Sequence, residues 1–515
     1  QWIFHRPNLL AMLFPCAALA RYWSFLYRAW STPWALVASK TTAPMEEALL
    51  KDSPGVTRTC CSCRVLIAVL GTAFLQYTVV SATSDMLKYV VLVDVLKAST
   101  LQIGLIDTIQ SVLDFITSLA GLGIFKAYLL ARSPHRCLYL GLLLTVAGLA
   151  GIGSSCTVGL SWAALLTYFL ANFVLSEGLD FFWTVWTPRF RRDGVHDIEM
   201  QYGTGGDMDV SAKMGQMQVV TRYPAQALAP LLMTSLLGIA GSQLAGVAVA
   251  YSAVALICII LVFAAGAIMP RPEAPAPGKS AKKKTMPLSW FDVLPRCVGD
   301  LAASCGVCKL PAEGRGQLFR QWFECGVFNS MTEAIRGGYT RVIALKALKS
   351  GMSPADLALI LAVVFWTATL FFWLSDVADS GRRNGAVWSF LLLGLGHTGL
   401  GLSTTTPYLL ASAVLFGLGE GMSTGLRGVV KNDYVVRNGV LAARKDRVGR
   451  SEEGYFNEEQ RNAFSTLTNI WSDATLIING LIVGVVGQFF GMTTASLAYA
   501  GLALLATLFV GLYMP

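Results

Sequence analysis

The chain has 515 residues, of which 54% are hydrophobic and 14% are charged, and its mean hydropathy is +0.55. Soluble globular proteins usually carry about 25% charged residues, so this composition excludes an ordinary soluble protein. The formal net charge of +9 would favour nucleic-acid binding in a soluble chain. Here the basic residues lie between apolar segments, and we expect no nucleic-acid partner.

About twelve apolar stretches of roughly 20 residues or more follow one another along the chain, each long enough to cross about 30 Å of hydrocarbon. This number and length predict an all-α polytopic membrane protein. The predicted spans are 65–93, 101–125, 137–158, 161–186, 209–236, 240–269, 318–344, 355–376, 386–404, 407–429, 460–488 and 492–513.

Two polar segments divide the chain into four predicted parts: 1–61, 62–269, 270–316 and 317–515. Aromatic and basic residues alternate in the leader 1–61, which favours an amphipathic helix at the membrane interface, with a residual targeting element as the alternative. The Pro- and Lys-rich segment 270–316 is predicted to be a loop between two six-helix bundles. A plasma membrane and an organelle inner membrane both remain open.

Basic residues follow the even-numbered spans, whereas most odd-numbered connections, such as 151–155 and 403–406, carry no charge. Arg189, Arg191 and Arg192 follow the fourth span, for example. This asymmetry places both termini and the central loop on the cytoplasm-like side, and the same basic surfaces suit anionic lipid headgroups.

An acid and a base three residues apart occur once in each half. Asp85 and Lys88 reappear 248 residues later as Glu333 and Arg336, each pair in the first span of its half. Asp180 and Glu420 form a second correspondence, and Gln218 and Arg222 correspond to Asn469 and Asp473. Matches in the same order predict two pseudo-symmetric six-helix bundles around a shared site.

Two stretches, 131–136 (Ala-Arg-Ser-Pro-His-Arg) and 378–383 (Ala-Asp-Ser-Gly-Arg-Arg), occupy equivalent connections. They resemble the Gly-x-Leu-Ala-Asp-Arg-x-Gly-Arg-Arg signature of the major facilitator superfamily. The first copy has Ala in place of the Asp, and the second holds its Asp one residue too close. The resemblance implies a cytoplasmic latch made by Arg132, Arg136, Asp379, Arg382 and Arg383.

The resemblance also implies a central site lined by helices 1, 4, 7 and 10, with contributions from helices 5 and 11. The polar and aromatic residues that fall there are our candidates for substrate binding or gating. They are Gln76, Asp85, Lys88, Trp183, Arg222, Asn329, Glu333, Arg336, Asn469 and Asp473.

Three acids lack a basic residue within one helical turn, which makes them candidates for proton coupling: Glu177, Asp180 and Glu420. The acid–base pairs at 85/88 and 333/336 have other interpretations, because residues three apart on a helix can neutralise each other. Pairing of Asp85 with Arg336 across the halves would instead make a gate. Asp107 and Asp114 are expected to be ordinary residues near the membrane boundary.

The eleven cysteines favour free thiols over a disulfide scaffold. Cys297, Cys305 and Cys308 have a metal-like spacing without a matching second pair, so we predict no metal and no cofactor.

No phosphate-binding loop and no catalytic signature occurs, and we predict that the protein is not an enzyme. The predicted function is secondary transport of a small polar or charged organic solute by alternating access, coupled to protons. One alternative is a carrier-fold protein that serves as a structural or assembly subunit of a larger membrane complex, favoured by predicted basic loops at 187–208 and 431–456. A solute sensor on the same fold is another.

Overall fold

The computed structural model describes residues 61–119, 134–158, 161–202, 207–239, 242–268, 312–375, 382–403, 405–445, 472 and 474–513. The chain divides into two compact units, Gln1–Cys63 with Asp197–Gly205 and Arg64–His196 with Gly206–Pro515. All interactions reported below belong to the second unit. Two predicted parts, the leader 1–61 and the central loop 270–316, lie almost wholly outside the described residues.

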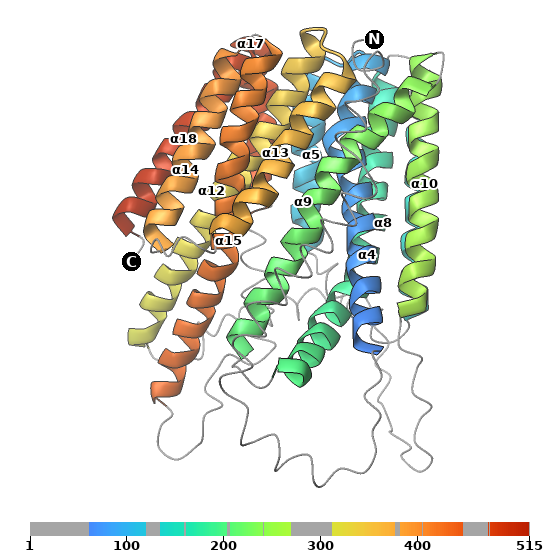
Figure 1. Ribbon diagram of the computed structural model, residues 1–515. Coiled ribbons are helices and arrows are strands. Elements are labelled where there is room, and N and C mark those ends of the chain that lie inside the picture. Colours follow the sequence, from blue (N-terminus) through green and yellow to red (C-terminus); the bar gives the residue numbers. More distant parts are fainter. Residues whose placement is uncertain are drawn as a thin grey trace, which may run out of the picture. The chain divides into compact units, whose positions relative to one another are not determined.

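Every regular element in the described ranges is helical (Figure 1). The first half contains α4 (Cys61–Ser81), which continues through the π-helical segments η1 (Ala82–Leu87) and η2 (Val90–Val95). It then contains α5 (Thr100–Leu119), α7 (Pro134–Val158), α8 (Trp162–Tyr202), α9 (Asp207–Ile239) and α10 (Gln243–Ile268).

The second half repeats this order. It contains α12 (Ala312–Lys349), α13 (Pro354–Ser375), α14 (Arg382–Leu402), α15 (Thr406–Lys445), the helical segment Ala474–Phe489 and α18 (Gly491–Tyr513). The segment Ala474–Phe489 includes η3 (Ile482–Val486) and α17 (Gly487–Phe489). Each predicted span therefore has a helical counterpart.

Six described helices are long and apolar enough to cross a membrane by themselves: Arg136–Thr157, Trp162–Phe182, Gln243–Ala264, Pro354–Phe372, Arg383–Leu402 and Gly491–Leu512. The other six predicted spans correspond to α4 with its π segments, α5, α9, α12, α15 and Ala474–Phe489. The first five of these carry the charged groups described below, which lowers their apolarity, whereas Ala474–Phe489 is apolar but shorter.

The predicted loops at 187–208 and 431–456 are wrong in part, because α8 continues to Tyr202 and α15 to Lys445. Charge marks where a span leaves the hydrocarbon, but it does not end a helix. Arg, Lys, Glu, Met and Gln all have high helix propensity, so both helices extend beyond their apolar parts.

The two halves contact each other through equivalent helices. α5 packs against Ala474–Phe489, and α9 packs against α13 (Figure 1). Counted along the chain, these are helices 2 and 11 and helices 5 and 8, which a two-fold axis between the halves interchanges. The structure thus confirms the predicted pseudo-symmetric architecture.

Glycine permits the first of these contacts. A Cβ atom added to Gly104 of α5 would lie only 2.2 Å from the Cα atom of Gly484. The two helix backbones can approach this closely only because neither residue has a side chain, as is common between membrane helices.

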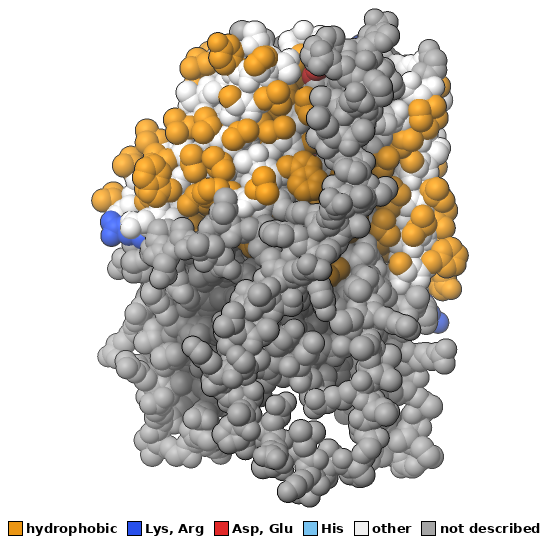
Figure 2. Space-filling view, viewed as in Figure 1, with side chains coloured by type: hydrophobic (Ala, Val, Ile, Leu, Met, Phe, Trp, Pro, Cys, Tyr) orange, Lys and Arg blue, Asp and Glu red, His pale blue; other side chains and the backbone are white. Residues whose placement is uncertain are grey.

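Large hydrophobic side chains lie exposed on the outside of both halves, among them Leu143, Phe263, Trp388 and Leu512. In the face seen in Figure 2, hydrophobic groups cover most of the described surface. A protein in water rarely exposes so much apolar area, whereas lipid tails solvate it.

Candidate functional site

The π-helical segments η1 and η2 lie on either side of Lys88, near the end of the first span. Single π turns inside helices occur often at functional sites. Asp85, inside η1, accepts a hydrogen bond from Ser81 Oγ at 2.8 Å. Lys88 instead pairs with Asp107 of α5, and Arg341 of α12 pairs with the same carboxylate. The predicted internal pairing of Asp85 with Lys88 is therefore wrong.

Asp107 is the centre of a first polar cluster, which we call the Asp107 cluster. Its carboxylate contacts Lys88 Nζ through Oδ1, and Arg341 Nε lies 3.1 Å from Oδ2. Asn172 Nδ2 donates to Gln110 Oε1 at 2.8 Å, and Lys88 Nζ lies 3.5 Å from the same oxygen. The cluster joins α4, α5 and α8 of the first half to α12 of the second.

The expectation that Asp107 is an ordinary boundary residue is wrong. Its side chain is completely buried, and two cations share it. Asp107 lies seven residues from the start of α5, about 10 Å along the helix axis. That depth is enough to remove the carboxylate from water.

Asn479 extends this polar region within the second half. Its side chain is fully buried, and neither amide atom has a hydrogen-bond partner within the described part of the chain. A Cβ atom on Gly337 would lie 2.9 Å from Asn479 Nδ2 and 3.3 Å from Arg341 Nη1, so the amide lies near Arg341. Buried polar atoms of this kind are commonly satisfied by water.

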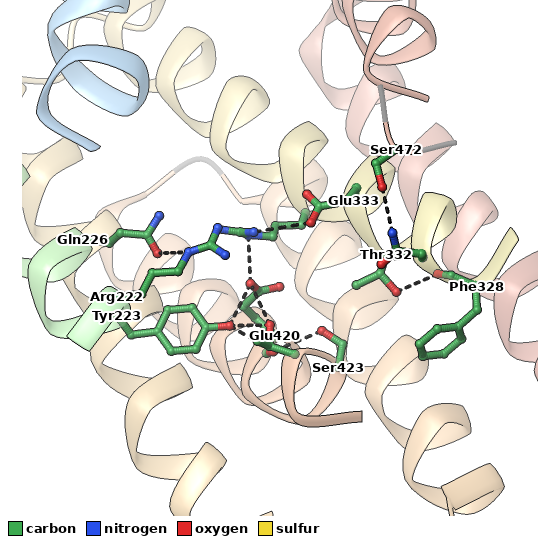
Figure 3. A network of polar contacts seen from close by, with 12 residues as sticks. Arg222, Tyr223, Gln226, Phe328, Thr332, Glu333, Glu420, Ser423 and Ser472 are labelled. Carbon is green, nitrogen blue, oxygen red and sulfur yellow. Dashed lines mark hydrogen bonds and ion pairs between the residues drawn. The ribbon is translucent and has the colours of Figure 1, made fainter. Parts of the chain in front are cut away.

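Glu420 of α15 is the centre of a second cluster, the Glu420 cluster (Figure 3). Its side chain is buried, and Oε1 lies 2.8 Å from Arg336 Nε of α12. Tyr223 of α9 donates its hydroxyl to the same oxygen at 2.9 Å and lies 2.5 Å from Thr424 Oγ1. A tyrosine of the first half thus binds the acid of an ion pair in the second half.

Glu333 is a weaker partner of Arg336, because its Oε1 lies 3.7 Å from Nη1. Figure 3 shows Glu333 and Glu420 on one side and Arg222 and Tyr223 on the other, with their polar ends turned toward one another. Arg336 is held chiefly by Glu420, on a different helix, and not by the acid three residues before it.

Arg222 enters the site from α9, one residue before Tyr223. Its Nε donates to Gln226 Oε1 at 3.3 Å, and its guanidinium carbon lies 5.8 Å from the centre of the Tyr77 ring. Pro224 lies inside the same helix. Proline removes one backbone hydrogen bond and bends a helix locally, so the bend falls beside the two residues that reach the second half.

The two clusters lie at different depths. Arg336 and Arg341 are five residues apart on α12, which is about 7.5 Å along the helix axis. Arg341 is the nearer of the two to the short connection after Lys349. The Asp107 cluster therefore lies between the Glu420 cluster and the end of the unit that carries the short connections.

Of the remaining candidate residues, two have contacts in the structure and three have side chains outside the described residues. Gln76 is buried, and its Nε2 donates to the carbonyl of Leu179 at 3.1 Å, which joins α4 to α8. Asn329 donates to Ser472 Oγ at 2.8 Å. The side chain of Trp183 lies outside the described residues, as do the predicted candidates Asn469 and Asp473.

The three predicted proton-coupling acids differ in environment. Glu420 is buried, Glu177 is partly buried, and Asp180 is exposed, so the expectation that Asp180 is a buried acid is wrong. Glu420 is also not without a base, because Arg336 comes from a helix that the local sequence does not reveal. At the 248-residue offset of the first repeat, the counterpart of Glu420 is Asn172, which belongs to the Asp107 cluster.

The predicted latch is only partly described. Arg132 and Asp379 lie outside the described residues, as does the side chain of Arg382. Arg136 is exposed on α7, and Arg383 contacts the carbonyl of Gly511 in the last turn of α18. A basic side chain there stabilises the end of a helix, and the latch role stays a prediction.

The described cysteine side chains Cys137, Cys156 and Cys258 form no disulfide. In the described part of the chain, no group of three His, Cys, Asp or Glu side chains has the arrangement of a metal site. The spaced residues Cys297, Cys305 and Cys308 lie outside it.

Sequence reasoning missed Arg341, Tyr223 and Asn479. Arg341 had a usable signal, because a charged residue eight positions from the end of a membrane helix is rarely without a partner. Tyr223 and Asn479 had none, since isolated Tyr and Asn side chains are frequent in membrane helices and only the fold brings them to the charges.

No family model matches the sequence, and no curated protein matches it. Solved structures do resemble the fold. The nucleoside transporter NupG superimposes with a TM-score of 0.54 at 13% identity, covering 88% of this chain and 99% of that one. A peptide transporter POT in complex with sulfate gives 0.53 at 16% identity, covering 87% and 93%. The human organic anion transporter MFSD10 gives 0.53 at 13% identity, covering 88% and 100%.

The chain therefore has the fold of the major facilitator transporters, an integral multi-pass membrane architecture. This agrees with the fold that the resemblance of the two signature-like stretches implied. The identities of 13–16% establish the fold alone.

Proposed function

We propose that the protein is a secondary active transporter that moves a small polar or charged organic solute by alternating access, coupled to protons. One observation carries the proposal. The buried acid Glu420 forms an ion pair with Arg336 in its own half and accepts a hydrogen bond from Tyr223 in the other half. A proton on Glu420 would change both contacts at once.

The coupling follows from electrostatics. Protonation removes the negative charge of Glu420 and weakens its attraction for Arg336, which is strong in a medium from which water is excluded. The released guanidinium is then available to a solute. Binding of the proton and of the solute are linked through one side chain, and each favours the other.

The contacts between the halves support a rocking motion. Thr234 Oγ1 of α9 donates to the carbonyl of Pro354 at 3.3 Å, Lys349 Nζ of α12 contacts Thr100 of α5, and the Asp107–Arg341 pair lies beneath them. All of them lie toward the short connections. Each is a single hydrogen bond or ion pair, so it can break and re-form as the site opens toward the short connections.

The structural neighbours support transport as the class of function, since they include nucleoside, peptide and organic anion transporters. Membrane lipids are proposed partners, because the outer surface is apolar. We further propose that both termini face the cytoplasm-like side, on the basis of the basic even-numbered connections.

The test is uptake into proteoliposomes with and without an imposed pH gradient, across organic anions, amino acids, sugars and nucleosides. Glu420→Gln should abolish accumulation driven by the gradient while keeping exchange of solute across the membrane. Asp356→Asn, at an acid on the first turn of α13, is the matched control and should behave as the parent protein. Gradient-driven uptake that is equal in Glu420→Gln and the parent would remove the coupling.

The alternative function, a structural or assembly subunit, predicts a different outcome. Such a protein would transport none of the solutes and would migrate in a larger native assembly. The buried ion pairs of both clusters favour transport, because charged groups inside a membrane are expensive and usually functional.

A further inference from the structure

We propose that Arg222 and Arg336 together bind the oxyanionic group of an organic anion, a carboxylate or a phosphoryl group. This inference rests on the transport function proposed above and names its substrate class. Arg222 is the charged residue of this site that the acid–base repeat does not explain.

Arg222 is a half-buried cation that makes no ion pair with a described acid. Within the described part of the chain, no carboxylate lies within ion-pair distance of its guanidinium. Its contacts are the hydrogen bond to Gln226 and the ring of Tyr77, both uncharged. An arginine near the centre of a membrane helix costs about 2.5–3.5 kcal/mol on insertion scales, so a partner of opposite charge is expected.

A second guanidinium lies next to it. Arg336 approaches from the other half, because Tyr223, the residue next to Arg222, and Arg336 both bind Glu420 Oε1. Glu420 faces Arg336 through Nε, while Glu333 is 3.7 Å from Nη1, beyond hydrogen-bond distance. Two cations beside each other, with the closer acid Glu420 and the more distant Glu333 both placed on Arg336, attract an anion to the space that they share.

The chemistry of guanidinium selects the ligand group. Its planar donors match the two oxygens of a carboxylate or of a phosphoryl group in a bidentate geometry. Tyr77 adds an aromatic wall beside Arg222, against which the carbon part of a solute can pack. A neutral solute would leave the repulsion between the arginines in place, and a cationic solute would increase it.

The charge balance connects the anion to the proton. The two clusters with Arg222 and Asp85 contain four bases and four acids among the described residues: Lys88, Arg222, Arg336 and Arg341 against Asp85, Asp107, Glu333 and Glu420. The set is therefore neutral before the solute binds. One proton on Glu420 makes it cationic by one charge, and one monoanion restores neutrality. A monoanion and a proton should enter together.

The experiment measures the thermal unfolding of the purified full chain with pairs of compounds that differ in charge. Suitable pairs are nicotinate and nicotinamide, benzoate and benzamide, adenosine monophosphate and adenosine, and glucose 6-phosphate and glucose. A ligand at 100 times its dissociation constant stabilises a protein by about 2.7 kcal/mol. We expect a shift with at least one anion and none with its neutral partner. The carboxylate and phosphate pairs distinguish the two kinds of oxyanion.

Arg222→Gln is the decisive variant. Its matched control is Lys97→Gln, which removes one positive charge from an exposed lysine in a short connection. We expect the affinity for the anion to fall at least tenfold in Arg222→Gln and to be unchanged in Lys97→Gln. Arg222→Lys keeps the charge without the planar fork and should be intermediate. It also provides a folded variant if Arg222→Gln is too unstable to purify.

Two negative results of these experiments would have different meanings. Equal shifts with the neutral partners, or unchanged anion affinity in Arg222→Gln, would overturn the assignment of an anion while leaving a solute carrier. The absence of binding and of liposome uptake for every compound would overturn the transport function and the anion site with it.

Discussion

Arg341 of the second half and Asp107 of the first half form an ion pair of 3.1 Å inside the membrane region. Lys88 binds the other oxygen of the same carboxylate. One acid therefore holds cations from two halves, which the proposed alternating access would separate. A single buried carboxylate is the centre of the contact on the side of the short connections.

Asp107→Asn should destabilise the protein, because it leaves two cations in a buried site with no acid between them. Removal of one partner from a buried ion pair usually costs about 3–5 kcal/mol. The measurement is the thermal unfolding midpoint in detergent. The double variant Asp107→Asn/Lys88→Met removes one of the orphaned cations and should recover part of the loss. A single variant as stable as the parent protein would contradict the proposed role of this pair.

Exchanging the charges of residues 85 and 88 tests which partners matter. If these residues only paired with each other, the double variant Asp85→Lys/Lys88→Asp would be tolerated. In the structure, an aspartate at position 88 would instead face Asp107, and like charges in a buried site repel. We expect loss of transport and lower stability. Normal transport by the exchanged protein would show that Lys88 does not depend on Asp107.

Gly104→Leu tests the contact between α5 and Ala474–Phe489. Even a Cβ atom at residue 104 would lie 2.2 Å from the Cα of Gly484, so the helices must move apart. We expect slower transport and greater labelling of a cysteine introduced at Thr108 by a membrane-impermeant thiol reagent. Gly153→Leu, at a glycine of α7 with nothing within 4 Å, is the control and should label as the parent does. Unchanged labelling in Gly104→Leu would mean that this contact does not hold the halves together.

The helices and their pseudo-symmetry could be predicted because apolar length and the repeat of an acid and a base are local signals. The partner that each charged side chain finds on another helix could not be predicted from such signals. Glu420 carries no base within a turn, and its partner Arg336 is 84 positions away in the chain. Likewise, the sequence placed Asp107 near the boundary because its neighbours looked ordinary, whereas the fold brings Lys88 and Arg341 to its buried carboxylate.

The residue offset between the two halves was the other source of error. The 240-residue offset joined Asp180 to Glu420, but Asp180 is exposed and Glu420 is buried. Loops of different length between the helices change the offset along the chain. A match of residue type at a different offset from that of the first helix, such as Asp180 with Glu420, is therefore unreliable, and the folded environment distinguishes equivalent from unrelated acids.

This difference between the acids gives a further prediction. Asp180→Asn should retain most of the gradient-driven uptake that Glu420→Gln loses, because an exposed side chain can exchange its proton with its surroundings without altering an ion pair between buried groups. Uptake at several external pH values compares the two variants directly. Equal loss in both would restore Asp180 as a coupling residue.

His397 is the histidine that lies buried in the described part of the chain, and so the main competitor of Glu420 for the role of proton carrier. Its ring stacks on Tyr499 at 5.1 Å and meets Tyr339 and Phe416 edge to face at 5.3 and 5.5 Å. Nε2 lies 2.8 Å from the carbonyl of Ile335, an arrangement in which the ring nitrogen donates its proton.

These contacts lie within the second half and involve neither side chain of the Glu420–Arg336 ion pair, which indicates a packing role. His397→Gln should therefore lower the unfolding midpoint, since each aromatic contact contributes about 0.5–1.5 kcal/mol. The pH dependence of uptake should keep its shape, because no proton is exchanged at this ring during transport. A variant with normal stability that no longer responded to the pH gradient would move proton coupling from Glu420 to His397.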